Sequence, residues 1–480
     1  MREKSPGIKL LFAVLIGLAL IVPLVFVYAL VNDRQGQSRT AQQSIAAGWG
    51  GAQVIAGPVI VVPFKATQIQ NEEVGGKTIS RTVEVERQLF ISPVANAVTT
   101  ALKPQERRKS IYSSVLFEAD VSGRARFALP ADLPRFGVTA EKLEWDRAEL
   151  RIGTSDARGL TKGGKIVANG QSLSVEPGRG PAATGGQGFF AFVGWDGANA
   201  LDVAYSFSLR GSRSLSLVPR GGQTKWAITS SWPNPSFGGS FLPEERRIDN
   251  QGFKAAYTID KLALGQAPVA TEDMGVPVIG DDVSPQYASI DIPVARNTGE
   301  AVSGQSPAVT VGLVEPVDLY SRVDRSVKYG FLFIGFTFLA FLMFDIVGGA
   351  RVAAAEYLMT GAGLVLFFVL LLAFAEVIGF TAAYLLASAA IIGLLTTYSA
   401  AVLRSWRRAR FIGALLLGLY AVLYVLLSLE AWSLLIGAVM LFLALAGVMY
   451  ATRKVDWSAV GRSVDASLTP PAAVSQTPAS

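Results

Sequence analysis

The apolar residues of this chain are concentrated in two blocks, which a long polar region separates. The first block is the almost uncharged run of residues 8–31, and the second is residues 329–452, apolar over nearly their whole length. Backbone N–H and C=O groups must be paired inside a lipid bilayer, so apolar runs of this length are expected to form membrane helices. The pattern therefore predicts an integral membrane protein with one large domain between its first and second spans.

The polar residues within these blocks divide them into six predicted transmembrane α-helices, one N-terminal and five C-terminal. The first run is too long for the core of a signal peptide, so we interpret it as an uncleaved anchor, which Pro23 is expected to kink. The five later helices are predicted at residues 329–347, 357–375, 380–403, 411–429 and 431–451. The links at 376–379 and at Glu430 are so short that tight helical hairpins are expected there.

Residues 32–328 show a different periodicity. Apolar and polar residues alternate in short runs such as 83–86, 204–209 and 215–218, and Gly, Pro, Ser and Thr are frequent between them. A period of two with frequent turn residues predicts half-buried antiparallel strands. We therefore expect an all-β, sandwich-like extracytoplasmic domain here, followed by a five-helix domain at 329–452 and a disordered cytoplasmic tail at 453–480.

The short loops indicate the orientation in the membrane. Arg2 and Lys4 precede the first span, four arginines lie between residues 404 and 410, and Arg453 and Lys454 follow the last span. Cytoplasmic loops carry an excess of Lys and Arg. With six spans, all these residues fall on one side, so both termini are predicted in the cytoplasm and the large domain on the opposite, outer side of the membrane.

Composition restricts the chemistry that the domain could perform. The chain has no Cys and no His, which excludes disulfides, thiolate nucleophiles, the usual zinc ligands and Ser-His-Asp triads. The net charge is +6, yet residues 32–328 hold 32 basic and 30 acidic residues, so no basic surface for nucleic acid is expected. No Gly-x-Ser-x-Gly or Ser-x-x-Lys motif is present. We predict a non-enzymatic protein without metal or cofactor, whose first partner is the lipid bilayer.

Three features of the chain could still carry a function. Gly159 to Lys165 nearly matches a phosphate-binding loop but lacks the Ser or Thr that binds magnesium, so we interpret it as a turn between strands. The stretch around Trp232, Asn234, Ser236 and Phe237 is dense in aromatic and turn residues. It could line a ligand surface, although a loop that caps the sandwich is the more usual role.

The third feature is a pair of acidic residues near predicted span ends, Glu356 and Glu376. An intramembrane carboxylate is a candidate for an ion or proton pathway. At a span end, however, it can also reach headgroups or water.

Several motifs together resemble the CreD family of bacterial inner-membrane proteins, over nearly the whole chain. The motifs that carry this resemblance are Trp49-Gly-Gly-Ala-Gln53, Gly57-Pro58 to Pro63-Phe64, Arg107-Arg108-Lys-Ser-Ile111-Tyr112, Ser155-Asp156-Ala-Arg158-Gly159, Gly211-Ser212, Trp232-Pro233, Pro235-Ser236-Phe237, Phe241-Leu242-Pro243, Val317-Asp318-Leu-Tyr320, Arg325 to Tyr329, Gly379-Phe380 and Met449 to Trp457. The family's usual histidines are missing at Ala353–Tyr357, at Val377 and at Asn234.

The resemblance implies a multi-pass protein of the stress-responsive envelope, linked to envelope integrity and colicin tolerance, with no known catalytic mechanism. Three functions follow as hypotheses. The leading one is a non-enzymatic protein whose outer domain binds or organises an envelope component. The second is a transporter or flippase that uses the C-terminal helices, with Glu356 or Glu376 as its polar element. The third is a membrane-surface enzyme that acts on lipid or cell-wall precursors without His or Cys.

Overall fold

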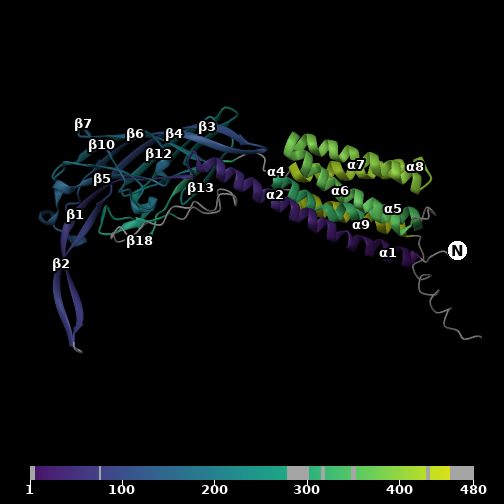
Figure 1. Ribbon diagram of the computed structural model, residues 1–480, viewed down its shortest axis with the longest axis horizontal. Coiled ribbons are helices and arrows are strands. Elements are labelled where there is room, and N and C mark those ends of the chain that lie inside the picture. The colour runs from purple at the N-terminus through teal and green to yellow at the C-terminus, as the bar shows by residue number, and fades with distance from the viewer. Residues whose placement is uncertain are drawn as a thin grey trace, which may run out of the picture. The chain divides into compact units, whose positions relative to one another are not determined.

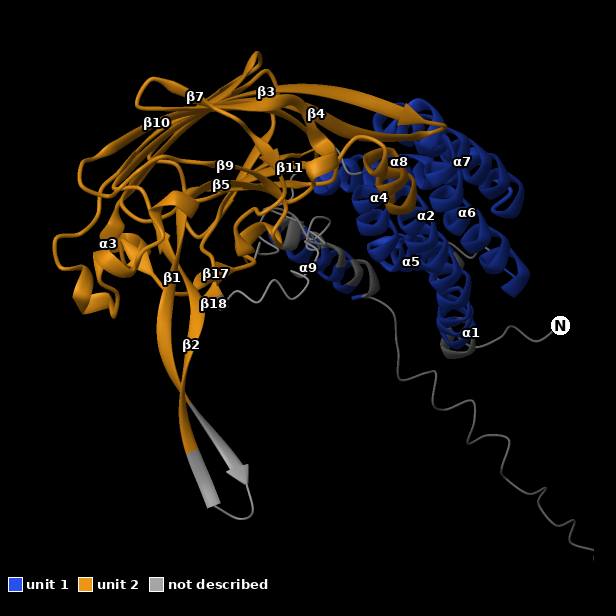
Figure 2. Ribbon diagram, turned by 60° about the vertical axis from the view of Figure 1, so that its left-hand side comes forward, with its two compact units in different colours: residues 1–38, 317–480 blue, residues 39–316 orange. Residues whose placement is uncertain are grey.

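The computed structural model describes residues 6–74, 77–277, 302–314, 319–346, 353–428 and 433–453. It divides into two compact units (Figure 2). Residues 1–38 and 317–480 form the helical unit, and residues 39–316 form the β unit. The predicted combination of apolar helices with a large β-rich domain is confirmed.

The helical unit contains the apolar helices of both sequence blocks. In chain order they are α1 (Pro6–Ala19), α2 (Ile21–Ala47), α4 (Leu319–Lys328), α5 (Gly330–Ile346), α6 (Ala354–Ile378), α7 (Phe380–Val402), α8 (Trp406–Ser428) and α9 (Ser433–Thr452). Only Gly379, with a φ of 80°, separates α6 from α7, because glycine adopts this left-handed conformation without steric cost. The two helices pack as the tight hairpin that the sequence predicted.

Five helical segments among the described residues are long and apolar enough to cross a membrane: Leu10–Ala47, Leu319–Phe344, Ala354–Ile378, Phe380–Val402 and Trp406–Ser428. The predicted count of six is not confirmed. In α9, at the position of the predicted sixth span, the described apolar stretch covers only Gly437–Gly447. A span needs about 20 apolar residues.

The N-terminal helix is broken and is longer than the apolar run. α1 ends at Ala19 and α2 begins at Ile21. Pro23, about one turn after Ala19, cannot donate a hydrogen bond to the carbonyl of Ala19. The helix is therefore interrupted one turn before Pro23, where the sequence predicts a kink. α2 then continues through the polar residues after Val31 to Ala47, and its residues from Arg39 onward are assigned to the β unit.

Aromatic rings and glycines let the membrane helices pack closely. The Phe367 ring lies 4.5 Å from the Tyr420 ring, and the Tyr384 hydroxyl donates to the Tyr420 carbonyl at 2.6 Å. A Cβ atom on Gly361 would stand 2.0 Å from the Leu20 side chain, so α6 approaches the α1–α2 break through this glycine. Small residues at helix contacts are typical of membrane bundles.

Two sheets form the β unit (Figure 1). The nine-stranded sheet follows the order β13-β19-β11-β1-β5-β9-β8, and β2 joins it through β1 and β16. Its strands are β1 (Gln53–Val74), β2 (Lys77–Ile91), β5 (Glu149–Thr154), β8 (Glu176–Pro177), β9 (Gly188–Phe192), β11 (Ser214–Val218), β13 (Pro235–Gly239), β16 (Val269–Ala270) and β19 (Val309–Leu313).

The eight-stranded sheet follows the order β14-β15-β12-β3-β4-β10-β6-β7. Its strands are β3 (Ala95–Lys109), β4 (Tyr112–Phe127), β6 (Leu160–Ala168), β7 (Gln171–Leu173), β10 (Leu201–Ser212), β12 (Gln223–Ser230), β14 (Glu245–Asp249) and β15 (Gly252–Ile259). A third, small sheet pairs β17 (Asp273–Gly275) with β18 (Val302–Gln305). The connections carry the short helices α3 (Lys261–Leu264), η1 (Leu133–Phe136), η2 (Ala140–Lys142), η3 (Trp145–Arg147), η4 (Ala157–Gly159) and η5 (Ala182–Thr184).

One hydrophobic core joins the two large sheets. Ile60 and Leu150 of the first sheet and Phe117 and Trp226 of the second belong to the same buried cluster. Trp226 stacks on Tyr257 at 5.4 Å, and its indole N–H donates to the Thr100 hydroxyl, which satisfies the polar atom that burial would otherwise leave unpaired. The alternating runs predicted as strands lie in β2, β10 and β11.

The antiparallel ribbon of β1 and β2 is longer than the sheet that holds it. The pairing runs from Ile60 opposite Ile91 to Val74 opposite Lys77, and the far half of the ribbon extends away from both sheets (Figures 1 and 2). Ile69 in this half is exposed.

Two predictions about local structure were wrong. Gly159 to Lys165, interpreted as a glycine-rich turn, lie in strand β6 (Leu160–Ala168) from Leu160 onward. There Gly164 makes room for the Phe189 ring, since a Cβ atom would stand 2.7 Å from it. Residues 319–328, assigned by sequence to the β domain, form the helix α4. Its buried residues Tyr320, Val323 and Val327 are spaced at a helical period and pack in the helical unit.

Candidate functional site

The predicted aromatic stretch forms one edge of the nine-stranded sheet. Trp232 donates its indole N–H to the carbonyl of Val314 at 2.9 Å, and the backbone N–H of Val314 donates to the carbonyl of Asn234. Ser236 lies opposite Gly312 in the pairing of β13 with β19, and the Phe237 ring meets Phe253 edge-on at 5.8 Å. All four residues are half-buried, and these contacts attach the segment to the core.

The predicted carboxylate Glu376 lies near the C-terminal end of α6, with two partners. Its Oε1 accepts a hydrogen bond from the Tyr320 hydroxyl at 3.2 Å, and its Oε2 lies 4.0 Å from a guanidinium nitrogen of Arg34. The carboxylate is only 12% exposed. Glu376 therefore links α6 to α4 and to α2 within the helical unit.

Glu356 lies in the first turn of α6, and its Oε2 accepts a hydrogen bond from the backbone N–H of Ala353 at 2.7 Å. A carboxylate here complements the unpaired N–H groups and the positive end of the helix dipole. Glu356 and Glu376 stand at opposite ends of the same helix, about 30 Å apart along its axis. The structure thus separates these two carboxylates.

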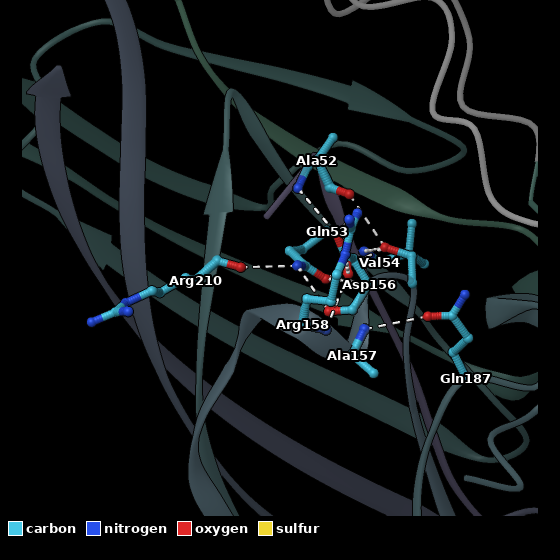
Figure 3. A network of polar contacts seen from close by, with 10 residues as sticks. Ala52, Gln53, Val54, Asp156, Ala157, Arg158, Gln187 and Arg210 are labelled. Atoms are coloured by element: carbon cyan, nitrogen blue, oxygen red, sulfur yellow. Dashed lines mark hydrogen bonds and ion pairs between the residues drawn. The ribbon is translucent and has the colours of Figure 1, made fainter. Parts of the chain in front are cut away.

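A buried glutamine in the β unit joins three distant segments (Figure 3). Gln53, at the start of β1, donates from Nε2 to the carbonyl of Arg210 at 2.8 Å and to the carbonyl of Asp156 at 3.3 Å. Its Oε1 accepts from the Asp156 backbone N–H at 3.3 Å and from the Ser155 hydroxyl. The side chain has no solvent exposure. We call this arrangement the Gln53 network.

Neighbouring residues complete the Gln53 network. The Val54 backbone N–H donates to the Ser155 hydroxyl at 2.9 Å, and the Ala157 N–H donates to Gln187. Gly159 has to be glycine, because a Cβ atom there would stand 2.4 Å from the Arg210 carbonyl. Every polar atom of the glutamine amide is therefore used to hold backbone segments together.

The carboxylate of Asp156 is held ionised. Burial acts to raise its pKa, but hydrogen bonds from the Arg158 side chain and from the backbone N–H groups of Arg158 and Gly51 act in the opposite direction. The pKa therefore lies below its ordinary value of 3.8. The exposed Arg158 guanidinium donates two of these bonds, each at 2.9 Å.

Two guanidinium groups contact the Trp49 ring beside the Gln53 network. The guanidinium of Arg210 lies 4.2 Å from the centre of a Trp49 ring, and that of Arg107 lies 5.1 Å from it. The Trp49 indole N–H donates to the carbonyl of Phe117 at 3.3 Å. These contacts fix the end of α2 on β4 and β10.

Sequence reasoning did not find the hollow on the solvent face of the eight-stranded sheet. Two adjoining depressions of about 520 and 570 Å³ lie over β12, β3, β4, β10 and β6, and they share Ala97, Arg124, Val167 and Ala204. We call this surface the sheet groove. Its floor consists of small, exposed side chains: Ala95, Ala97, Thr99, Ser122, Ala204 and Ser206.

The pairing of the strands brings the charged side chains of the sheet groove into two neighbouring rows. Lys225, Ala97, Arg124, Ala204 and Val167 form one row across the five strands, and Lys165 lies opposite Ser206 in the next row. Arg124, Lys165 and Lys225 make no ion pair with any described residue, whereas Arg126 lies 3.8 Å from Asp202. The sheet groove thus presents, on a floor of small residues, three cations without an ion-pair partner in the described part of the chain.

Among the described residues, no cluster of three or more His, Cys, Asp or Glu could hold a metal ion. The ionisable groups of the Gln53 network are committed to backbone and ion-pair contacts.

The chain matches a known family over nearly its whole length. A profile described as "Inner membrane protein CreD" matches residues 5–458. The Inner membrane protein CreD of Escherichia coli (strain K12) is 31% identical over 450 residues, which cover 92% of this chain and 91% of that protein. The chain belongs to the CreD family.

As a CreD-family member, the chain is an inner membrane protein with several apolar helices. Its β unit brings together three of the motifs that carry the sequence resemblance. The motifs at residues 49–53, 155–159 and 211–212 all meet at Gln53, since a Cβ atom on Gly211 would stand 2.7 Å from the Gln53 side chain. Three motifs of this CreD-family chain therefore meet at one buried structural junction.

Proposed function

We propose that this CreD-family protein is a non-enzymatic envelope-integrity protein whose β unit lies in the periplasm and binds an anionic component of the cell envelope. The sheet groove carries this proposal. Its three unpaired cations attract carboxylates or phosphates, and its floor of alanine, serine and threonine leaves room for an extended chain.

The proposed topology places both termini in the cytoplasm. It includes α9 as a sixth span, so that the number of crossings is even. The arginines at residues 404–410 then lie on the cytoplasmic side together with the N-terminal Arg2 and Lys4, as the excess of basic residues in cytoplasmic loops requires. The β unit, between the first and second spans, then faces the periplasm.

The residues proposed from sequence have supporting roles in this scheme. Trp232, Asn234, Ser236 and Phe237 hold the edge of the nine-stranded sheet, and Glu376 links three helices. A transport path would need polar groups that converge within the bundle, whereas Glu356 and Glu376 lie at opposite ends of α6. We therefore favour binding by the sheet groove over transport.

Complementation with charge-reversal variants tests the proposal. The groove variant carries Arg124→Glu, Lys165→Glu and Lys225→Glu. The control variant carries Arg135→Glu, Lys142→Glu and Lys261→Glu, which reverse the same number of exposed cations elsewhere on the β unit. Each is expressed in a host that lacks its CreD-type protein, and membrane levels are measured alongside envelope permeability and colicin sensitivity.

The expected result is that the wild-type chain and the control variant restore the envelope barrier and that the groove variant does not. Equal rescue by both variants, at equal membrane levels, would reject the sheet groove as the site. A host whose envelope is unchanged by loss of the protein would reject the envelope role itself.

A further inference from the structure

Three exposed arginines lie where the chain passes from α7 into α8. Arg404 is in the turn between the two helices, and Arg407 and Arg410 are among the first five residues of α8. None of the three guanidinium groups makes an ion pair, a hydrogen bond or a ring contact with a described residue. The half-buried Arg408 has a contact of its own and is not one of them. We call Arg404, Arg407 and Arg410 the arginine cluster.

Two of these arginines lie on the exposed face of α8. At 100° per residue, the buried residues of the helix fall within an arc of about 120°. They include Ala409, Ile412, Leu416, Leu419, Leu423 and Leu427. Arg407 and Arg410 fall on the opposite side. The same side continues along the helix through the exposed residues Phe411, Leu417 and Val425.

This exposed face is a surface for lipid chains. Trp406–Ser428 is one of the five segments long and apolar enough to cross a membrane, so its exposed apolar side chains face lipid tails. Trp406, the first residue of the segment, is 62% exposed, and tryptophan is enriched at the depth of the headgroups. Arg407 and Arg410 therefore lie at headgroup depth, at the end of an apolar, lipid-facing stripe.

The arginine cluster has no carboxylate close to it in the chain. Residues 380–429, which include all of α7 and α8, contain no Asp or Glu. Glu356 starts α6 at the same end of the α6–α7 hairpin, and its carboxylate accepts from the backbone N–H of Ala353. Side chains three residues apart on a helix are about 5–6 Å apart, so Arg407 and Arg410 can donate to one phosphate group.

We propose that the arginine cluster binds the phosphate of an anionic phospholipid whose acyl chains lie along the exposed face of α8. Arg407 and Arg410 donate to the phosphate oxygens, and Arg404 adds a third positive charge from the turn. A zwitterionic lipid offers the same phosphate, but its ammonium group is repelled by the three arginines. The site therefore prefers lipids with a net negative charge. Binding here is separate from the sheet groove, so either proposal can fail without the other.

A single fluorescent label on the full chain tests this proposal. Because the chain has no Cys, Ala414→Cys creates a unique labelling site on the exposed face of α8, one turn beyond Arg410. Met359→Cys is the control site, because Met359 is 58% exposed near the start of α6, at the same end of the helical hairpins. Each labelled chain is reconstituted into phosphatidylcholine bilayers that contain phosphatidylglycerol or phosphatidylcholine with brominated chains. Bromine quenches a label on contact, so the two samples compare the affinities of the lipids beside it.

The lipid beside position 414 is expected to be phosphatidylglycerol, with a preference of at least about fivefold, the factor that one basic residue near an anionic surface supplies. Position 359 is expected to show little preference. The substitutions Arg404→Gln, Arg407→Gln and Arg410→Gln, made together, should lower the preference at 414 to the level at 359.

A charge-matched variant separates the arginine cluster from the net charge of the protein. Arg135→Gln, Lys142→Gln and Lys261→Gln remove three exposed cations of the β unit and should leave the preference at 414 unchanged. Equal preferences at 414 and 359 would overturn the proposal, and so would a preference that survives loss of the three arginines. Glycerol 3-phosphate added in the water should have no effect. If it abolishes the preference at 414, the ligand is a soluble phosphate and not a lipid, which also overturns the proposal.

Discussion

At the scale of single residues, Gln53 determines how the β unit is assembled. Its amide group bonds to two segments that each lie more than 100 residues from Gln53 in the chain. The sequence shows the motifs around Gln53, Asp156 and Gly211 but not the reason for them, because each motif alone is a short polar run between strands. Only the folded chain brings the start of β1, the segment after β5 and the end of β10 to one amide group.

Replacement of Gln53 by Leu is expected to destabilise the β unit by about 2–4 kcal/mol, because buried backbone carbonyls and N–H groups would lose their partners. The matched control is Gln88→Leu, because Gln88 Oε1 is buried with no hydrogen-bond partner among the described residues. Thermal unfolding, followed by the circular dichroism of the strands, should show a clear loss for the first variant and little or none for the second. Equal loss in both would show that the Gln53 network adds no stability.

Asp156 gives the Gln53 network a dependence on pH. Its pKa is lower in the folded chain than the ordinary value of 3.8, so its contribution to stability is present above that pH and is lost as pH falls through the folded pKa. Asp156→Asn should therefore lower the melting temperature by about 2–4 °C at pH 7, which corresponds to about 1 kcal/mol for a partly exposed group. The difference should disappear in unfolding measurements well below pH 3.8. A difference of equal size at both pH values would contradict the assigned ionisation.

At the scale of elements, hydropathy located the apolar helices but not their ends. The apolar run stops at Val31, yet α2 continues to Ala47, because residues 32–47 contain no proline and their backbone hydrogen bonds can form in water as well as in lipid. α4 was missed because ten residues give few turns of periodicity, although Tyr320, Val323 and Val327 carried the signal. Hydropathy measures the preference for lipid, and helix ends depend on local capping and packing.

Substitution of Glu376 tests whether the helical unit carries a transport path. In Glu376→Gln the remaining carbonyl oxygen can still accept from the Tyr320 hydroxyl, while the 4.0 Å pair with the half-exposed Arg34 is lost. The expected cost in stability is below about 1 kcal/mol, and complementation should be retained. Loss of all activity in a variant that reaches the membrane at normal levels would instead support a transport path. Tyr320→Phe, which removes the other contact of Glu376, is the companion variant.

At the scale of the whole molecule, the sequence predicted apolar helices with a large β-rich domain, since the periods of hydrophobicity differ between the two. It did not predict the sheet groove. Lys225, Arg124 and Lys165 lie in different strands, and only the pairing of five strands places them on one face. In sequence each looks like an ordinary solvated lysine or arginine. Cross-strand register depends on contacts between distant segments, which no local pattern records.

The most direct test of the account is binding of the purified full chain to isolated envelope fragments that have been freed of inner membrane. The wild-type chain and the Arg135, Lys142 and Lys261 control variant should sediment with the fragments at low salt and dissociate as salt screens the charges. The variant with Arg124, Lys165 and Lys225 reversed to Glu should remain in the supernatant. If that variant sediments as well as the wild type does, the sheet groove is not the binding site, and the central claim is wrong.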